Sequence, residues 1–128
     1  MTSPFKTPLG KVRGLGSAKS GTEHFTLQRL TAIANLLLVP SALAVILAAS
    51  FLPYERAVRV VGHPLASILL IGLIVSVTTH MRLGMQVIIE DYVHGEGVKL
   101  LAVIANTLFA LAVAIAGIYA VLRIGLGA

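Results

Sequence analysis

The sequence predicts an all-α integral membrane protein with three transmembrane helices. Hydrophobic residues make up 57% of the 128 residues, charged residues only 12%, and the mean hydropathy is +0.94. So few charged side chains cannot cover the core of a soluble domain. Three apolar runs of about 23 residues are each close to the roughly 20 that cross a hydrocarbon core of about 30 Å. Helices are expected because three strands cannot close a barrel and would leave backbone groups unpaired in lipid.

The apolar runs divide the chain into a polar N-terminal segment, residues 1–28, and spans at about residues 30–52, 65–89 and 100–122. The remaining polar chain is too short for a soluble domain, so residues 1–128 are expected to form one membrane domain. The N-terminal segment lacks the early apolar core of a cleavable signal peptide and is expected to remain in the mature protein. Ser20 and Glu23 have the spacing of a capping box, which predicts a helix start near residue 21. Pro53 and the Gly62-His63-Pro64 sequence predict a short loop, and residues 90–97 a polar turn.

The distribution of basic residues predicts the orientation of the chain in the membrane. The net charge is +5, but the basic residues lie mostly at the edges of the spans, which argues against nucleic-acid binding. Five Lys and Arg residues precede the first span, two follow it, and one lies at the C-terminal end. Because basic residues are retained on the cytoplasmic side, the N-terminus and the 90–97 turn are expected to be cytoplasmic. The sequence has no cysteine, which excludes disulfides, thiolate-ligated iron–sulfur clusters and a cysteine nucleophile.

The second span carries the most chemically informative residue, His80. At 100° per residue, Gly84 lies on the same helix face and Ser76 on the same side one turn earlier. A neutral imidazole inside the membrane is a common axial ligand to haem iron, and Gly84 would leave room for a flat macrocycle. A hydrogen bond from His80 to a neighbouring helix explains the residue equally well. The spacing leaves both interpretations open.

Arg82 lies about 200° around the same helix from His80 and points elsewhere. The favoured interpretation is that the side chain of Arg82 extends (snorkels) to the cytoplasmic headgroups, because the second span is longer than the membrane core is thick. The alternative is an ion pair with an acidic group, such as a haem propionate or a carboxylate of a partner.

Asp91 and Tyr92 lie where this helix is expected to end, about 18 Å along its axis from His80. Taken alone, Tyr92 is most simply an interfacial anchor and Asp91 a solvated charge. The phenol could also donate a hydrogen bond to a quinone carbonyl that arrives from the membrane. The other histidines, His24, His63 and His94, lie near the interfaces and are expected to be surface hydrogen-bonding residues.

The first and third spans carry stripes of polar and small residues. In the first span the stripe contains Gln28, Thr31, Asn35 and Ala42, and in the third it contains Ala102, Asn106, Ala110, Gly117 and Ala120. Such stripes allow membrane helices to approach closely, so helix packing is the favoured interpretation of both. A substrate channel is the alternative.

The sequence HMRLGMQVIIEDYVH at residues 80–94 resembles the second-helix motif of the hydrophobic membrane anchor subunits of succinate dehydrogenase. It combines a His, a Gly four residues later followed by Met, and an Asp-Tyr pair at the helix end. The sequence GSAKSGTEHF at residues 16–25, followed by Gln28 and Arg29, resembles the segment that leads into the first span of that family. The chain differs from some relatives in having no tryptophan, with Gln86 where an aromatic residue can stand.

The resemblance implies a respiratory complex in the inner (cytoplasmic) membrane, made of a flavoprotein with FAD, an iron–sulfur protein and two membrane anchors in one heteromeric helix bundle. Succinate would be oxidised in the partner subunits, in the respiratory chain and the tricarboxylic acid cycle, and ubiquinone reduced near the cytoplasmic membrane surface. In this picture His80 is one axial ligand of a b-type haem, and the second anchor supplies the other. Gly84 and Ser76 pack against the haem. Tyr92, with Asp91 beside it, binds the quinone, and the chain itself contains no residue catalytic on succinate.

Two alternatives to the succinate dehydrogenase anchor remain at the sequence level. A fumarate reductase anchor runs the same chemistry in reverse, and the sequence hardly distinguishes the two. A small transporter or assembly scaffold would line a polar path with His80 and Arg82, but the paired repeats or broken helices typical of transporters are not evident.

Overall fold

The computed structural model describes residues 7–12 and 21–127, which form five α-helices and no strand. A short helix, α1, covers Pro8–Val12. The remaining helices are α2 (Gly21–Ser50), α3 (Tyr54–Val61), α4 (Pro64–Tyr92) and α5 (Glu96–Gly125). The helix start predicted near residue 21 is confirmed, whereas the capping residue Ser20 lies outside the described residues.

Three of these helices are long and apolar enough to cross a membrane: α2, α4 and α5, with 30, 29 and 30 residues. At 1.5 Å per residue each is about 45 Å long, so each extends beyond a hydrocarbon core of about 30 Å. The prediction of three transmembrane helices is thus confirmed. The helices are longer than the apolar runs because their polar first turns, such as that of α2, are helical as well.

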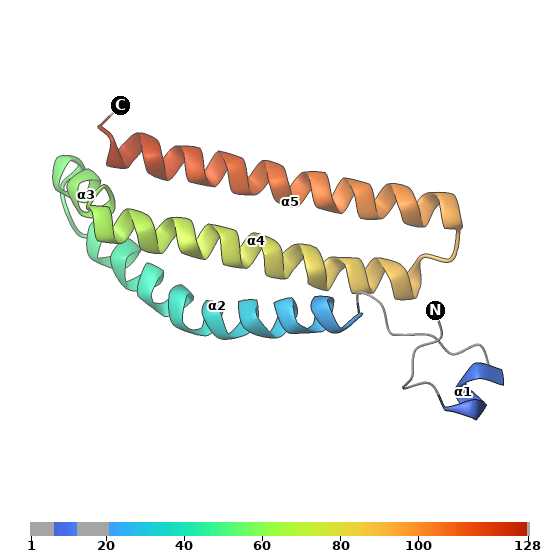
Figure 1. The fold of residues 1–128 in the computed structure, drawn as a ribbon. Helices are drawn as coiled ribbons and strands as arrows, with labels where there is room; N and C mark the ends of the chain where they lie inside the picture. Colours follow the sequence, from blue (N-terminus) through green and yellow to red (C-terminus); the bar gives the residue numbers. More distant parts are fainter. Residues whose placement is uncertain (1–6, 13–20, 128) are drawn as a thin grey trace.

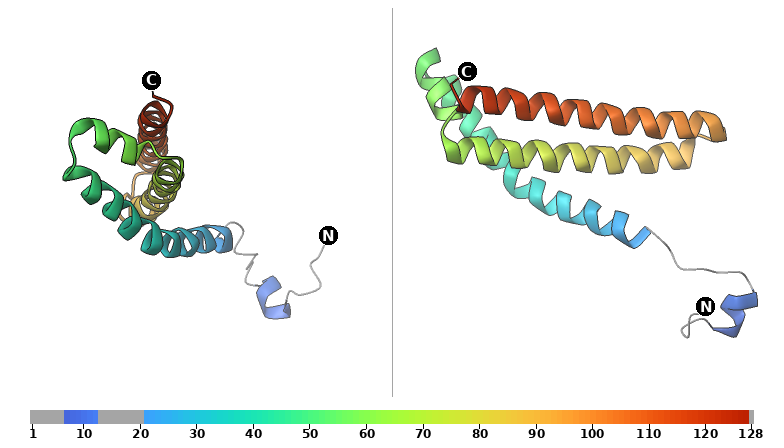
Figure 2. Two further views of the ribbon diagram at one scale, coloured as in Figure 1. Left: turned by 90° about the vertical axis from the view of Figure 1, so that its left-hand side faces the viewer. Right: turned by 45° about the horizontal axis from the view of Figure 1, so that its top comes forward.

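The spanning helices form an open layer with α4 in the middle (Figure 1). Among the described residues, α4 lies beside both α2 and α5, whereas the backbones of α2 and α5 do not approach each other closely. The start of α2, the end of α4 and the start of α5 point to one end of the layer, and α3 and the C-terminus lie at the other (Figures 1 and 2). The helix α2 is curved in Figure 1, and Pro40, which cannot donate a backbone hydrogen bond, lies inside it.

Small residues bring the helices together. Ala42 of α2 is 1% exposed and packs with Leu70 of α4 and Val121 of α5. A Cβ atom built on Gly117 of α5 would lie 3.1 Å from Cδ1 of Ile74, so the two helices touch at this glycine. Both predicted packing stripes therefore face α4. Towards the end of α5, Val121 is buried and Ala120 is exposed, because Val121 lies within about 20° of the buried Ala110 and Ala120 about 80° away from it.

The prediction of a loop between the first two spans is wrong for residues 54–61, because these residues form the helix α3. Pro53 precedes this helix as its N-cap and Gly62 ends it, so both residues delimit the helix rather than prevent it. The second predicted turn is shorter than expected: α4 continues through Tyr92 and α5 begins at Glu96. Only three residues, 93–95, connect them.

Most of the side-chain surface of the spanning helices is open in this chain. In the most apolar 18 residues of each helix, the buried share is 11% in α2, 17% in α4 and 6% in α5. Large apolar side chains such as Leu36 (73% exposed) and Leu101 (67% exposed) point away from the layer. Lipid or the helices of other subunits must cover these faces.

Candidate functional site

The site begins with a contact between α2 and α4. Nδ1 of His80 lies 3.0 Å from Oγ1 of Thr31, which is 8% exposed. One turn earlier on α4, the hydroxyl of Ser76 donates to the backbone oxygen of Thr31 at 3.4 Å. One turn later, a Cβ atom built on Gly84 would meet Nε2 of Gln28 at 3.5 Å. His80, Ser76 and Gly84 thus share the face predicted from their spacing, and this face meets the polar stripe of α2.

The hydrogen bonds of Thr31 determine the tautomer of His80. The single hydroxyl proton of Thr31 is directed to the backbone oxygen of Leu27, at 2.8 Å. With that proton on Leu27, the hydroxyl oxygen accepts from His80, and we assign the proton of the neutral imidazole to Nδ1. Nε2 then carries the lone pair, and no hydrogen bond from a described residue engages it. The contact is the hydrogen bond to a neighbouring helix that the spacing left open, and it leaves Nε2 available to a further group.

Three buried polar atoms along the same side of α2 have no hydrogen-bond partner among the described residues: Nε2 of His24, Oε1 of Gln28 and Oδ1 of Asn35. Buried polar atoms in native proteins are nearly always hydrogen-bonded. Inside a membrane an unsatisfied group costs several kcal/mol, because lipid offers no partner. Their partners must lie outside the described residues, for example in water or in a polar group that enters beside α2.

Arg82 lies on a different side of α4 from His80, as predicted. It is half-buried and lines a groove of about 250 Å³ between α4 and α5, together with the hydroxyl-bearing Thr78, Thr79 and Thr107. Its backbone oxygen accepts a hydrogen bond of 2.9 Å from Nδ2 of Asn106 in α5. Whether the guanidinium reaches headgroups, a propionate or a partner carboxylate stays a prediction.

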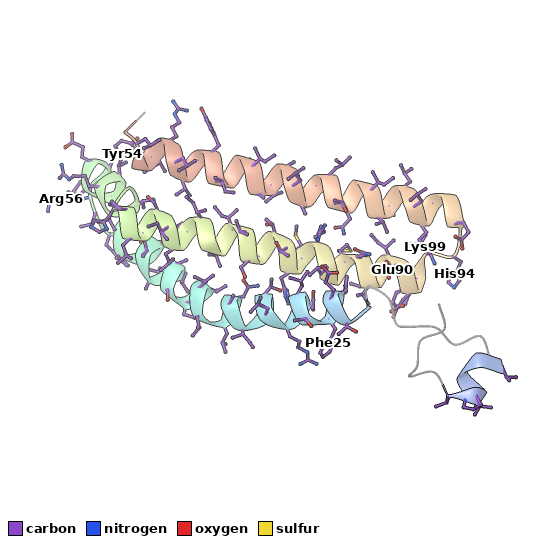
Figure 3. The ribbon with its side chains drawn as sticks, viewed as in Figure 1. Phe25, Tyr54, Arg56, Glu90, His94 and Lys99 are labelled. Carbon is purple, nitrogen blue, oxygen red and sulfur yellow. The ribbon has the colours of Figure 1, made fainter. Side chains whose placement is uncertain are left out.

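The end of α4 presents Asp91 and Tyr92 to the surroundings. Tyr92 is 77% exposed, and Asp91 is exposed as well. Among the described residues neither side chain forms a hydrogen bond or an ion pair. The neighbouring Gln86 donates to Glu90 at 2.7 Å. Figure 3 shows Glu90, His94 and Lys99 close to this end of the bundle, which is therefore polar and charged.

The other histidines have separate positions. His24 lies in the first turns of α2 and His94 is exposed in the connection between α4 and α5. His63 is the N-cap of α4, and its Nδ1 accepts from the backbone N–H of Leu65 at 3.3 Å. Within the described part of the chain, no three His, Cys, Asp or Glu side chains gather into a metal site.

Sequence reasoning missed Thr31 and Asn106 as parts of the site. Both were recognised as members of packing stripes, but their partners, His80 and the backbone of Arg82, depend on the register between helices. The sequence did contain a signal for Thr31: the first span has a polar stripe and the second a histidine, and polar groups inside a membrane are expected to pair.

The fold and the site define a class of protein: a three-span membrane subunit with large uncovered faces and one histidine oriented by a neighbouring helix. A family model for the succinate dehydrogenase/fumarate reductase transmembrane subunit matches residues 3–116. The succinate dehydrogenase hydrophobic membrane anchor subunit of Paracoccus denitrificans is 33% identical over 95% of this chain and 94% of its own length. That of Rickettsia bellii is 35% identical over 94% of this chain and 97% of its own length. No solved structure matches the chain.

The chain therefore belongs to the succinate dehydrogenase/fumarate reductase transmembrane family, and within it to the membrane anchor subunits of succinate dehydrogenase. It is a multi-pass membrane protein that functions with partner subunits, which agrees with the uncovered faces of its helices.

Proposed function

We propose that this anchor binds a b-type haem through His80 and forms part of a ubiquinone-reduction site at Tyr92. The observation that carries the haem proposal is the availability of Nε2 of His80, with Nδ1–H held by Thr31. The unpartnered atoms of His24 and Gln28 support it, because a cofactor with polar edges supplies partners to buried polar groups. The haem supplies a one-electron redox centre when bound.

The residues around His80 have distinct tasks in this proposal. Thr31 orients the ring and fixes its tautomer, Gly84 leaves space one turn along α4, and Ser76 ties α4 to the backbone of α2. The other membrane anchor would supply the remaining protein ligand to the haem iron. FAD and iron–sulfur clusters belong to the two soluble partner subunits, consistent with the lack of cysteine in this chain.

The hydrogen bond that Nδ1–H of His80 donates to Thr31 is testable as a positioning contact. Thr31→Val removes the acceptor, makes the imidazole a weaker donor to iron and is expected to raise the haem midpoint potential. If the variant binds oxidised haem roughly tenfold more weakly and reduced haem equally well, the midpoint potential rises by about 59 mV for a one-electron couple. Thr31→Ser keeps the hydroxyl and should restore the wild-type potential in a redox titration. An unchanged potential in Thr31→Val would show that the contact only packs the helices.

The quinone proposal rests on the exposed phenol of Tyr92 at the end of α4. Reduction of the quinone takes two electrons and two protons, and a phenol that donates to a carbonyl stabilises the negative charge developing there. The carboxylate of Asp91 lies at the same helix end, where water can exchange protons with it.

Tyr92→Phe is expected to slow quinone reduction while the complex and its haem spectrum remain intact. Loss of one neutral hydrogen bond of about 1 kcal/mol corresponds to roughly fivefold, and the effect is larger if the oxygen carries charge in the transition state. Quinone-reductase kinetics with purified complex measure it, and Tyr54→Phe, at the opposite end of the bundle, is the matched control (Figure 3). Wild-type kinetics and inhibitor sensitivity in Tyr92→Phe would leave Tyr92 as an interfacial anchor.

The proposed membrane is the inner (cytoplasmic) membrane, with the N-terminus and the 93–95 connection cytoplasmic. Five Lys and Arg residues precede the first span and Lys99 follows the second, whereas Arg56 and Arg59 lie between the first two spans and Arg123 follows the third. A reporter fused after Ala128 should be active outside the cytoplasm, and one inserted at Gly95 should be active inside it. The opposite pattern would reverse the orientation and place Tyr92 at the non-cytoplasmic surface, away from the proposed quinone-reduction site.

A further inference from the structure

A second polar feature lies at the opposite end of the bundle from Tyr92. A groove of about 650 Å³ opens between the last turns of α2, the helix α3 and the first turns of α4. Its walls are mostly apolar, and its polar side chains are Arg56, Arg59 and His63; the apolar lining residues are Val45, Leu52, Val60, Leu65, Ala66 and Leu69. Figure 3 shows Arg56 at this end of the molecule, far from His94 and Lys99. Neither proposed redox site includes any of these residues.

The two arginines of the groove are not neutralised by the described chain. Arg56 and Arg59 are three residues apart on α3 and therefore project from one side of this helix. Both are exposed, and neither forms an ion pair with a described residue. Of the five acidic residues in the sequence, only Glu55 lies at this end of the layer. Among the described residues, two arginines thus face one nearby carboxylate, and the rim of the groove carries a net positive charge.

His63 adds a third hydrogen-bond donor to the same rim. Because Nδ1 accepts from the backbone N–H of Leu65, the proton of the neutral ring is on Nε2. The groove thus combines two guanidinium groups and an imidazole N–H with no acidic side chain among its lining residues. Such a donor set is complementary to an oxyanion, and a guanidinium matches a phosphate with two parallel hydrogen bonds.

The position of the groove indicates which phosphate it meets. It lies where α2 ends and α4 begins, at the boundary between the spanning segments and the polar end of the bundle. Lipid phosphates lie at this depth, just outside the hydrocarbon core. Below the cationic rim, Val45 and Leu69 continue the wall into the spanning part of α2 and α4. A volume of about 650 Å³ is in the range of sites that hold a small molecule or a large part of a lipid.

We infer that this groove binds one anionic phospholipid from the leaflet that surrounds the α3 end. The phosphate lies against Arg56, Arg59 and Nε2–H of His63, and an acyl chain follows the apolar wall between α2 and α4. The bound lipid fills a gap that the protein side chains leave open and ties α3 to the two spanning helices.

The test uses the purified native complex, stripped of loosely bound lipid in detergent and titrated with phosphatidylglycerol or phosphatidylcholine. Native mass spectrometry counts the bound lipids. We expect one phosphatidylglycerol to be retained when phosphatidylcholine is lost, and each of Arg56→Gln and Arg59→Gln to weaken its binding roughly tenfold. The Arg56→Lys/Arg59→Lys variant, which keeps both charges, should lose less affinity than the double glutamine variant. Arg123→Gln, an equal charge loss at the same end but outside this groove, should leave binding unchanged.

Three results would overturn the inference. The first is equal retention of phosphatidylglycerol in the double glutamine variant and the wild type. The second is occupation of the groove by inorganic phosphate that phosphatidylglycerol does not displace, which would make it a site for a soluble anion. The third is a cross-link to a partner subunit from a photo-cross-linking residue placed at Leu65, which is 70% exposed on the groove wall. We expect it to yield a phospholipid adduct, and an adduct with a partner subunit would show that protein covers the groove.

Discussion

His80→Ala is expected to abolish the b-type haem spectrum of the assembled complex, while the soluble subunits still oxidise succinate with an artificial electron acceptor. The substitution removes the imidazole that Thr31 orients on α4 with Nε2 left free. Succinate oxidation persists because that chemistry lies outside the membrane. The measurement is the dithionite-reduced absorption spectrum of the purified complex, together with the rate of succinate oxidation.

Two variants control for damage to the fold. His94→Ala removes an exposed imidazole fourteen residues later and should leave the spectrum unchanged. His80→Gln keeps a side chain that can hydrogen-bond Thr31 but is a poor haem ligand, so it should assemble and still lose the normal spectrum. A wild-type spectrum in His80→Ala would show that the haem iron has another ligand.

Gly117→Leu is expected to be the most damaging substitution outside the proposed redox sites. A Cβ atom at this position already lies 3.1 Å from Cδ1 and 3.3 Å from Cγ2 of Ile74, so a leucine pushes α5 away from α4. Overpacking of this kind costs about 1–3 kcal/mol. Few residues of α5 are buried, so the helix has little other packing with which to retain its position. We expect a lower yield of assembled complex and a lower unfolding temperature.

Gly97→Leu, in the first turn of the same helix, is the matched control, because a Cβ atom there meets nothing within 4 Å. Ile74→Ala should partly rescue Gly117→Leu, since it removes the atoms with which the leucine collides. If Gly117→Leu assembles as well as Gly97→Leu, the contact between α4 and α5 contributes little to the stability of the subunit.

The sequence predicted the spanning helices well, because a long apolar run has few alternatives in a membrane. It did not predict α3, because proline and glycine were interpreted as breaking the chain rather than delimiting a helix. Pro53 fits the residue before the first turn, and the half-buried Val58 and Val61 provide α3 with an inner face. A segment of only eight residues shows too little periodicity to be distinguished from a loop.

The sequence predicted which residues of α4 share a helix face, but it did not predict the residues of other helices that they contact. Helical spacing alone placed His80 with Ser76 and Gly84, because positions four apart share a face. Spacing within a helix contains no information about which residue of another helix lies opposite. The contact between His80 and Thr31 joins residues 49 positions apart, and only the three-dimensional structure provides that register. The choice between a haem ligand and a helix-packing histidine depends on this contact, because it determines which ring nitrogen is free.

The central claim is that His80 offers Nε2 to a haem iron shared with the second anchor. The most direct test is a reduced-minus-oxidised spectrum and haem assay of the native complex, purified through a tag on this chain. We expect one b-type haem for each copy of this subunit, and three other polypeptides in the preparation. An active four-subunit complex that contains no haem would contradict the claim and leave the Thr31–His80 contact as helix packing alone.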